Sequence, residues 1–210
     1  MNIFVQNLIS NSLFFWLVTL SVIPSICLHE YAHAQTALWM GDDTAARRGH
    51  LTLNPLRQMG WISLIMFLII GIAWGAVPVN RNNLTRRGAV LVSLSGPLMN
   101  LFLAIFGAVL LLIMLLLHAH GIAVNSLLAK YFYYLGIYNL VLFLFNMLPV
   151  PGLDGWGVIA EFIPFRKVHS EWIKGIMLLL MLLLITCFDY IFMAAAWVMH
   201  WIPVLAEKMT

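Results

Sequence analysis

His29, Glu30 and His33 form the pattern His-Glu-x-x-His. On a helix, side chains four residues apart project from the same face, so the two imidazoles can share one metal ion. Glu30 lies beside them, where it can reach a water molecule at the metal without being a ligand itself. Two ligands and a general base at this spacing are typical of zinc hydrolases.

The motif lies in an apolar stretch in which Glu30 is the only charged residue between Met1 and Gly41. An ionisable side chain in a membrane segment is costly and marks a functional site by default. Hydrophobic residues make up 63% of the chain and charged residues 9%, whereas soluble domains contain about 25% charged residues. The chain is therefore predicted to be an integral membrane protein that lies in a lipid bilayer.

The apolar segments predict an all-α polytopic membrane protein with about five to six membrane segments. Expected helices span about Ser12 to Met40, Gly88 to Leu117 and Leu127 to Met147. Residues 175–205 are apolar except for Asp189, and either two short spans that turn at Asp189 or one tilted helix would fit them.

A single membrane-embedded domain is expected over residues 1–210, with its core at about 12–160 and C-terminal membrane segments at about 172–205. The net charge is +3, but basic residues in a membrane protein usually mark cytoplasmic loops, so no nucleic-acid partner is expected.

Two basic clusters flank the apolar residues 59–79: Arg47, Arg48 and Arg57 on one side, and Arg81, Arg86 and Arg87 on the other. The positive-inside rule places both clusters in the cytoplasm, whereas a single crossing would separate them. We therefore expect a re-entrant or β-hairpin-like segment near residues 50–80, with a true span as the alternative. Glycines in this segment fit non-helical backbone that lines a cavity in the protein.

A catalytic zinc site needs three protein ligands and an open position. With both basic clusters inside, the helix from Leu127 ends on the cytoplasmic side, and Asp154 follows it at the depth of His29 and His33. Asp154 is therefore the expected third ligand, although Leu153-Asp154-Gly155 could also be a simple turn. Asp42 and Asp43 are competitors that are closer to the histidines in sequence.

Three segments together resemble the site-2 protease family of intramembrane zinc metalloproteases: residues 28–34 with the histidines, Ser95-Gly96-Pro97-Leu98-Met99-Asn100, and residues 146–155, which end in Leu-Asp-Gly. The resemblance covers about residues 15–160. Residues 51–56 and 77–80 resemble the compact bacterial and archaeal branch, which has no inserted PDZ domain. No one motif is as specific as this combination.

The resemblance implies that His29, His33 and Asp154 bind Zn²⁺ and that Glu30 is the general base. Asn146 matches an asparagine that binds the substrate backbone, and Asn100 matches one with a structural or site-lining role. The implied activity is hydrolysis of peptide bonds within or next to transmembrane segments of membrane protein substrates. The implied location is a prokaryotic cytoplasmic membrane, with the active site toward the cytoplasm.

A substrate helix must unwind before it is cut, so we also expect an extended substrate to add as a strand to the edge of the 50–80 segment. The alternative functions are a membrane metal transporter or sensor and an inactive relative that binds membrane proteins. The remaining histidines are expected to be solvated or interfacial: His50, His118, His120, His169 and His200.

Overall fold

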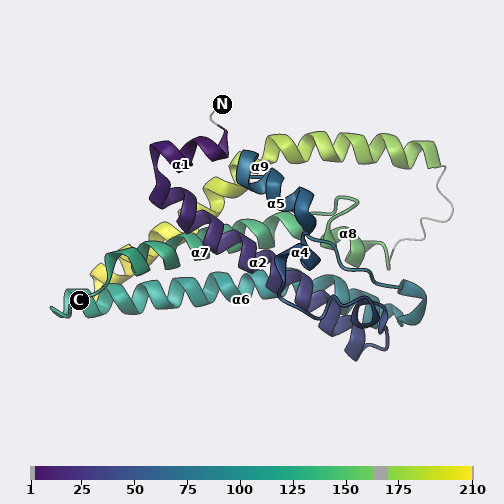
Figure 1. The fold of residues 1–210 in the computed structure, drawn as a ribbon, viewed down its shortest axis with the longest axis horizontal. Helices are drawn as coiled ribbons and strands as arrows, with labels where there is room; N and C mark the ends of the chain where they lie inside the picture. Colours follow the sequence, from purple (N-terminus) through teal and green to yellow (C-terminus); the bar gives the residue numbers. More distant parts are fainter. Residues whose placement is uncertain (1–2, 163–169, 210) are drawn as a thin grey trace.

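The computed structural model describes residues 3–162 and 170–209 (Figure 1). All regular structure in these residues is helical, as predicted. The long helices are α2 (Ser12–Trp39), α6 (Arg86–Ala119), α7 (Ser126–Asn146) and α9 (Ser170–Met209). Four described segments are long and apolar enough to cross a membrane, namely α2, α6, α7 and residues Cys187–Met209 of α9. The expected five to six such segments are therefore not confirmed.

Polar side chains cap the start of three long helices. The side chain of Asn11 accepts a hydrogen bond from Phe14 N, Thr85 from Gly88 N, and Asn125 from Leu127 N and Leu128 N. The first N–H groups of a helix have no partner within it, so a capping oxygen fixes where the helix begins. These caps explain why the helix starts expected from sequence lie within two residues of the observed ones.

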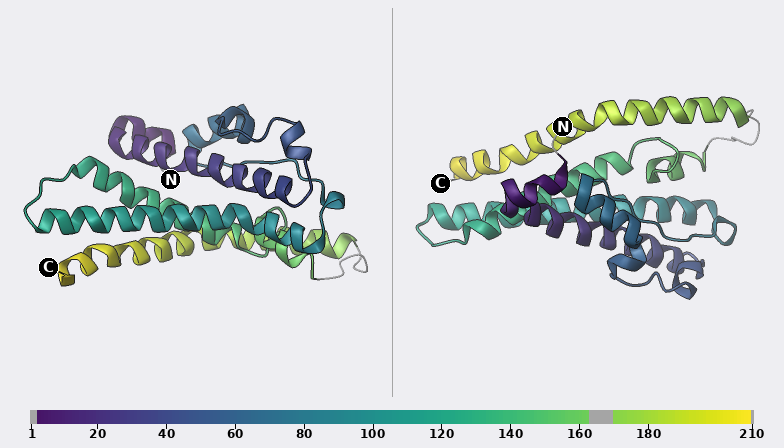
Figure 2. Two further views of the ribbon diagram at one scale, coloured as in Figure 1. Left: turned by 90° about the horizontal axis from the view of Figure 1, so that it is seen from below. Right: turned by 45° about the horizontal axis from the view of Figure 1, so that its top comes forward.

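Helices α6 and α7 pack against each other along their length and form the centre of the bundle. Helix α2 packs on one side of this pair, and the second half of α9 packs on the other (Figure 2). The contact with α9 buries a cluster of apolar side chains drawn from three helices: Leu111, Ile137, Val141, Ala195 and Met199. The side of α6 and α7 that faces α2 is the side on which the histidines lie.

The segment expected to be a strand-like hairpin is instead a short helix followed by extended chain. Helix α5 spans Gly60–Ile70 and ends at Gly71, whose φ of 82° is left-handed. Eleven residues of helix are about 16 Å long, too short to cross a bilayer. No strand forms in the described residues, because the strongly apolar run from Trp61 to Ile70 satisfies its backbone hydrogen bonds within a helix.

Residues 72–80 then return to the start of this helix. Ala76 N donates to the carbonyl of Gln58 over 3.0 Å. The buried hydroxyl of Ser63 donates to the carbonyl of Trp74 over 2.6 Å and accepts from its N–H over 2.9 Å. This return is the shape that a re-entrant segment requires, and re-entry into the membrane stays a prediction.

Helix α9 continues through Asp189 without a turn, so the alternative of two short spans that meet there is wrong. Asp189 is exposed. The single helix is the other expected form of residues 175–205.

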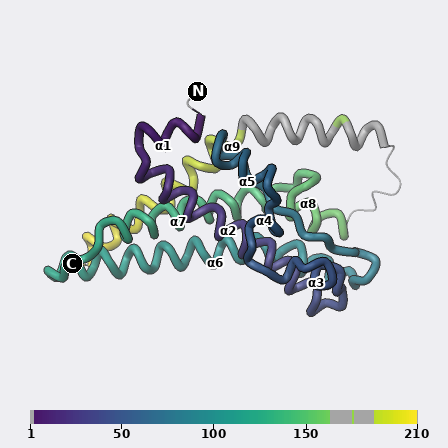
Figure 3. The backbone as a smooth tube through the Cα atoms, viewed as in Figure 1, coloured from purple at the N-terminus to yellow at the C-terminus, as the bar shows by residue number. Residues whose placement is uncertain are grey.

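Short helices lie in the polar segments on either side of α5: α3 (Thr44–Arg47) and α4 (Pro55–Gln58) precede it (Figure 3), and η2 (Arg81–Asn83) follows it. Asp42 connects α3 to the segment that contains η2, because its buried carboxylate accepts hydrogen bonds from Thr44, Asn80 N and Asn83 Nδ2. At the other end, η1 (Phe4–Gln6) and α1 (Asn7–Ser10) precede α2, and the ring of Phe4 contacts Phe15 and Phe67. Both ends of the α5 region are thus fixed to α2.

Candidate metal centre

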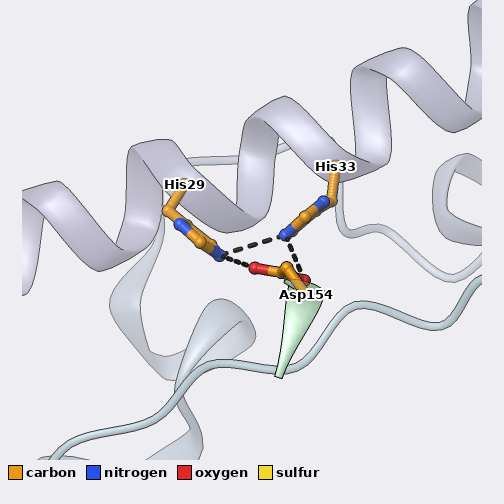
Figure 4. Close-up of side chains that lie close together, drawn as sticks. All are labelled: His29, His33 and Asp154. Atoms are coloured by element: carbon orange, nitrogen blue, oxygen red, sulfur yellow. Dashed lines mark hydrogen bonds and ion pairs between the residues drawn. The ribbon is translucent and has the colours of Figure 1, made fainter. Parts of the chain in front are cut away.

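Three side chains that the sequence predicts as metal ligands meet at one point (Figure 4). His29 Nε2 lies 3.0 Å from Asp154 Oδ2, His33 Nε2 lies 3.2 Å from Asp154 Oδ1, and the two Nε2 atoms are 3.0 Å apart. Both histidines are buried in α2, and Asp154 is the first residue of α8 (Asp154–Ile159). No other cluster of three potential metal ligands occurs in the part of the chain that the structure describes.

Helix α6 holds Asp154 in place from the other side. The short helix α8 packs against α6, and two contacts tie residues just after it to η2 and to the start of α6. Arg81 Nη1 lies 3.1 Å from Glu161 Oε1, and the guanidinium of Arg86 lies 4.4 Å from the centre of the Phe162 ring. Asp154, which follows α7 in the sequence, is therefore held near the histidines of α2 by a turn that is attached to α6.

Both imidazoles have an acceptor at Nδ1. His33 Nδ1 lies 2.6 Å from the carbonyl oxygen of Val92, and His29 Nδ1 lies 2.6 Å from Asn100 Oδ1. A carbonyl oxygen can only accept, so each Nδ1 carries the proton and donates it. In a neutral imidazole the other nitrogen, Nε2, then presents a lone pair to the space between the three side chains.

The donor set fits zinc. Two lone pairs and a carboxylate converge within 3.2 Å of one another, an arrangement that is repulsive unless a cation lies among them. Zinc binds histidine nitrogen and carboxylate oxygen at about 2.0–2.2 Å, which puts tetrahedral ligand atoms about 3.3 Å apart.

Gly96 leaves space on α6 for the imidazoles of His29 and His33. A Cβ atom on Gly96 would overlap Nε2 of both His29 and His33. Only glycine lets the backbone of α6 approach the imidazoles this closely. The Ser95-Gly96-Pro97 motif therefore has a steric role at the site.

Glu30 is 7% exposed and faces the extended segment that follows α5. Its carboxyl group is near enough to His29, His33 and Asp154 to interact electrostatically with all three. It is not one of the three converging ligands. The structure thus places Glu30 beside the three converging side chains, and its role as general base stays a prediction.

The two predicted asparagines lie in different surroundings. Asn100 is fully buried, and its amide is engaged at both ends, since Oδ1 accepts from His29 and Nδ2 donates to Asn139 Oδ1 over 3.0 Å. This arrangement favours the site-lining role over substrate binding. Asn146 is the last residue of α7 and is half-buried, and its contact with substrate stays a prediction.

The competing residues lie elsewhere. Asp42 binds the loops after α2 and before α6, and Asp43 pairs with Arg47 at 2.7 Å. Four other histidines are outside the metal cluster: His50, His118, His120 and His200. His169 lies outside the described residues.

Sequence reasoning missed three contributors: Gly75, Gly96 as a steric element, and Asn139. Asn139 is fully buried in α7, where its Nδ2 donates to Ser25 Oγ over 2.8 Å and to the carbonyl of Leu135 over 2.9 Å. A polar amide amid apolar residues on a membrane helix is the signal that could have found it. No pattern in the sequence shows that Gly75 approaches Glu30.

Comparison with known proteins gives relatives that share most of this chain. No family model matches the sequence, and no solved structure gives a significant match. YwhC of Bacillus subtilis, whose name provisionally assigns it to the zinc metalloproteases, is 42% identical over 154 residues, which cover 70% of this chain and 69% of YwhC.

Rip2 proteins of two mycobacteria carry the same provisional assignment. Rip2 of Mycolicibacterium smegmatis is 37% identical over 152 residues, and Rip2 of Mycobacterium tuberculosis is 37% identical over 155 residues. The matches cover 69% of this chain and 56% of each Rip2 protein. The chain therefore spans little more than half of the Rip2 length.

Proposed function

Because this chain belongs to the site-2 protease family of zinc metalloproteases, we propose that it cleaves peptide bonds within or next to transmembrane segments of membrane proteins. One observation carries this proposal: His29, His33 and Asp154 converge on buried surface between helices that are long and apolar enough to cross a membrane. A hydrolytic site in that position meets its substrate within the bilayer.

His29, His33 and Asp154 would hold the zinc ion through Nε2, Nε2 and the carboxylate. When bound there, zinc supplies Lewis-acid chemistry: it acidifies water and polarises a carbonyl group. Glu30 would accept the proton from the attacking water and pass it to the leaving amine. Its buried position keeps bulk water away from the carboxylate, so proton transfer is directed to the reacting groups.

The extended segment 72–80 offers an edge to an unwound substrate. Trp74 and Ala76 direct their backbone groups toward α4 and α5. The backbone groups of the alternate residues Gly75, Val77 and Val79 have no partner in the residues described here. A strand paired along this edge would lie about 4.8 Å from it, and therefore beside Glu30.

The charge distribution supports an active site toward the cytoplasm. Six arginines lie between α2 and the first turn of α6: Arg47, Arg48, Arg57, Arg81, Arg86 and Arg87. Two of them, Arg81 and Arg86, contact Glu161 and Phe162, which follow the helix that begins at Asp154. The connection at the opposite end, between α6 and α7, has no arginine. In a prokaryotic cytoplasmic membrane, the positive-inside rule puts the arginine-rich end in the cytoplasm.

Peptide mapping of cell membranes tests the proposal. Membranes from cells that express the wild type or Glu30→Gln are compared by mass spectrometry for new protein termini. The wild type should generate termini within or next to transmembrane segments, and Glu30→Gln should not generate them. Termini that depend on Glu30 but lie only in soluble domains would contradict cleavage in the membrane.

The same variant separates proteolysis from metal transport. A transporter needs exchangeable polar sites at several depths, whereas the metal ligands of the described residues form one cluster. Glu30→Gln should abolish proteolysis and leave zinc bound, because Glu30 is not in that cluster. Zinc uptake into vesicles that depends on His29 but not on Glu30 would favour transport.

A further inference from the structure

A chain of hydrogen bonds runs from α7 through α6 to the metal ligand His29 on α2. Asn139 Nδ2 donates to the carbonyl of Leu135, Asn139 Oδ1 accepts from Asn100 Nδ2, and Asn100 Oδ1 accepts from His29 Nδ1. The three distances are 2.9, 3.0 and 2.6 Å. Asn100 and Asn139 are both 0% exposed, so water does not compete for these bonds.

The carbonyl of Leu135 at the end of this series fixes which group donates and which accepts in every hydrogen bond. The carbonyl of Leu135 can only accept, so the group that Asn139 turns toward it must be Nδ2. Ser25 confirms this orientation, because its hydroxyl donates to the carbonyl of Ser21 over 2.6 Å and is left to accept from Asn139 Nδ2. Asn139 must then present its oxygen to Asn100.

The same reasoning carries forward to the imidazole. Asn100 Nδ2 donates a hydrogen bond to the oxygen of Asn139, and Asn100 therefore presents its own oxygen to His29. His29 can satisfy that oxygen only with a proton on Nδ1. The proton is thereby kept off Nε2, the atom that faces His33 and Asp154.

We propose that Asn139 is a positioning residue for the zinc site: through Asn100 it holds His29 with its proton on Nδ1, so that Nε2 is free to bind zinc. This role rests on the proposed zinc site and goes beyond it, because Asn139 touches neither the ligand cluster nor Glu30. Outer partners of histidine ligands fix ring orientation and tautomer in this way.

Without the oxygen of Asn139, the buried Nδ2 of Asn100 has no acceptor. Asn100 can then rotate its amide and turn N–H groups toward His29 Nδ1. The imidazole would respond by moving its proton to Nε2, which is the atom needed for zinc. The defect is therefore expected in metal binding rather than in the packing of α7 alone.

The test measures zinc affinity in detergent-purified full-length protein by competition with a chromophoric chelator. Asn139→Leu keeps the volume of the side chain and removes its hydrogen bonds, and Asn139→Ala serves if the leucine variant does not fold. Either variant should bind zinc about 10-fold or more weakly than the wild type, the lower end of the range for outer partners of metal ligands. Val141→Ala is the control, because Val141 is buried in α7 against α6 and α9.

A double variant distinguishes a relay from a general loss of stability. If Asn139 acts through Asn100, Asn100→Leu combined with Asn139→Leu should bind zinc no more weakly than Asn100→Leu alone. Additive losses, or a loss in Val141→Ala equal to that in Asn139→Leu, would overturn the relay. Unchanged affinity in Asn139→Leu would also overturn it while leaving the zinc site intact, whereas a wild type that binds no zinc would remove both proposals.

Nitrogen-15 NMR of the histidine rings in zinc-free protein gives an independent readout. The wild type should show His29 with its proton on Nδ1, and Asn139→Leu should shift part of the population to Nε2. Loss of signals in His29→Gln assigns the resonances. Identical tautomer populations in the two proteins would contradict the proposal.

Discussion

The backbone of Gly75 lies against the carboxyl group of Glu30, so closely that a Cβ atom on Gly75 would overlap Oε1, Cγ and Cδ. Gly75 is held there from both sides, because the flanking residues Trp74 and Ala76 are bonded to Ser63 and Gln58. The extended segment and the proposed general base therefore cannot move independently. This contact connects the proposed substrate-binding edge to the proposed general base.

Gly75→Ala should lower the rate of proteolysis by about 100-fold, because a displacement of a catalytic group by about 1 Å has an effect of that size. Zinc content should stay at the wild-type level, since Glu30 is not in the ligand cluster. Proteolysis assays and zinc analysis on the same preparation check both parts. Gly175→Ala is the matched control, because a Cβ on Gly175 meets nothing within 4 Å; equal losses in the two variants would refute this account of Gly75.

Gly96→Ala should lose zinc, because the added methyl group overlaps Nε2 of His29 and His33. The rigid imidazoles cannot move aside without leaving the metal. Zinc per chain, measured by mass spectrometry on purified protein, should fall well below that of the wild type. Leu98→Ala changes an exposed side chain on the same helix and should retain zinc. Full zinc content in Gly96→Ala would show that α6 does not limit the space at the site.

Val77→Pro should impair cleavage of transmembrane substrates and leave zinc binding unchanged. The substitution removes an N–H group that is unpaired among the described residues and that would donate to a substrate strand. Val77→Ala keeps the N–H and is the matched control for the lost side chain. The comparison uses cleavage rates and zinc content for both variants. Equal loss of cleavage and zinc in Val77→Pro, or equal cleavage in the two variants, would rule out pairing at this edge.

Acid should weaken the attachment of the loops to α2 through Asp42. Burial raises the pKa of the Asp42 carboxyl, but hydrogen bonds from Thr44, Asn80 and Asn83 more than offset this and hold the pKa below its ordinary value of 3.8. A lowered folded-state pKa means that the stabilisation is complete above about pH 4 and is lost as the pH falls through the folded-state pKa.

Asp42→Asn should therefore destabilise the protein by about 2 kcal/mol at pH 7, the usual contribution of hydrogen bonds to a charged group. The difference from the wild type should shrink as the pH falls below 4. Thermal unfolding in detergent across this pH range measures both effects. Asp43→Asn should change little, because Asp43 forms an exposed ion pair with Arg47. A pH-independent difference would show that the charge of Asp42 is not what stabilises the loops.

Much of this site could be predicted from sequence because its signals are local. The spacing of His29 and His33 fixes their common face once α2 is helical, and the caps Asn11, Thr85 and Asn125 mark where long helices begin. Asp154 could be placed by topology, since basic clusters orient the helices and helix lengths set its depth.

The remainder depends on contacts that local patterns do not carry. The backbone hydrogen bonds of residues 61–70 could form either within a helix or in a hairpin. Periodicity does not distinguish helix from strand for so short an apolar run. The approach of Gly75 to Glu30 arises from the way α5 folds back. Asn139 gains its significance from Asn100 and Leu135, which become its neighbours only in the folded bundle.

Zinc per chain in detergent-purified wild type, Glu30→Gln and Asp154→Ala tests the central claim most directly. The structure predicts about one zinc in the wild type and in Glu30→Gln, because His29, His33 and Asp154 form the ligand cluster and Glu30 does not belong to it. Asp154→Ala should lose the metal, since two imidazoles alone do not complete a catalytic zinc site. No zinc in the wild type, or full retention in Asp154→Ala, would contradict the three-ligand site.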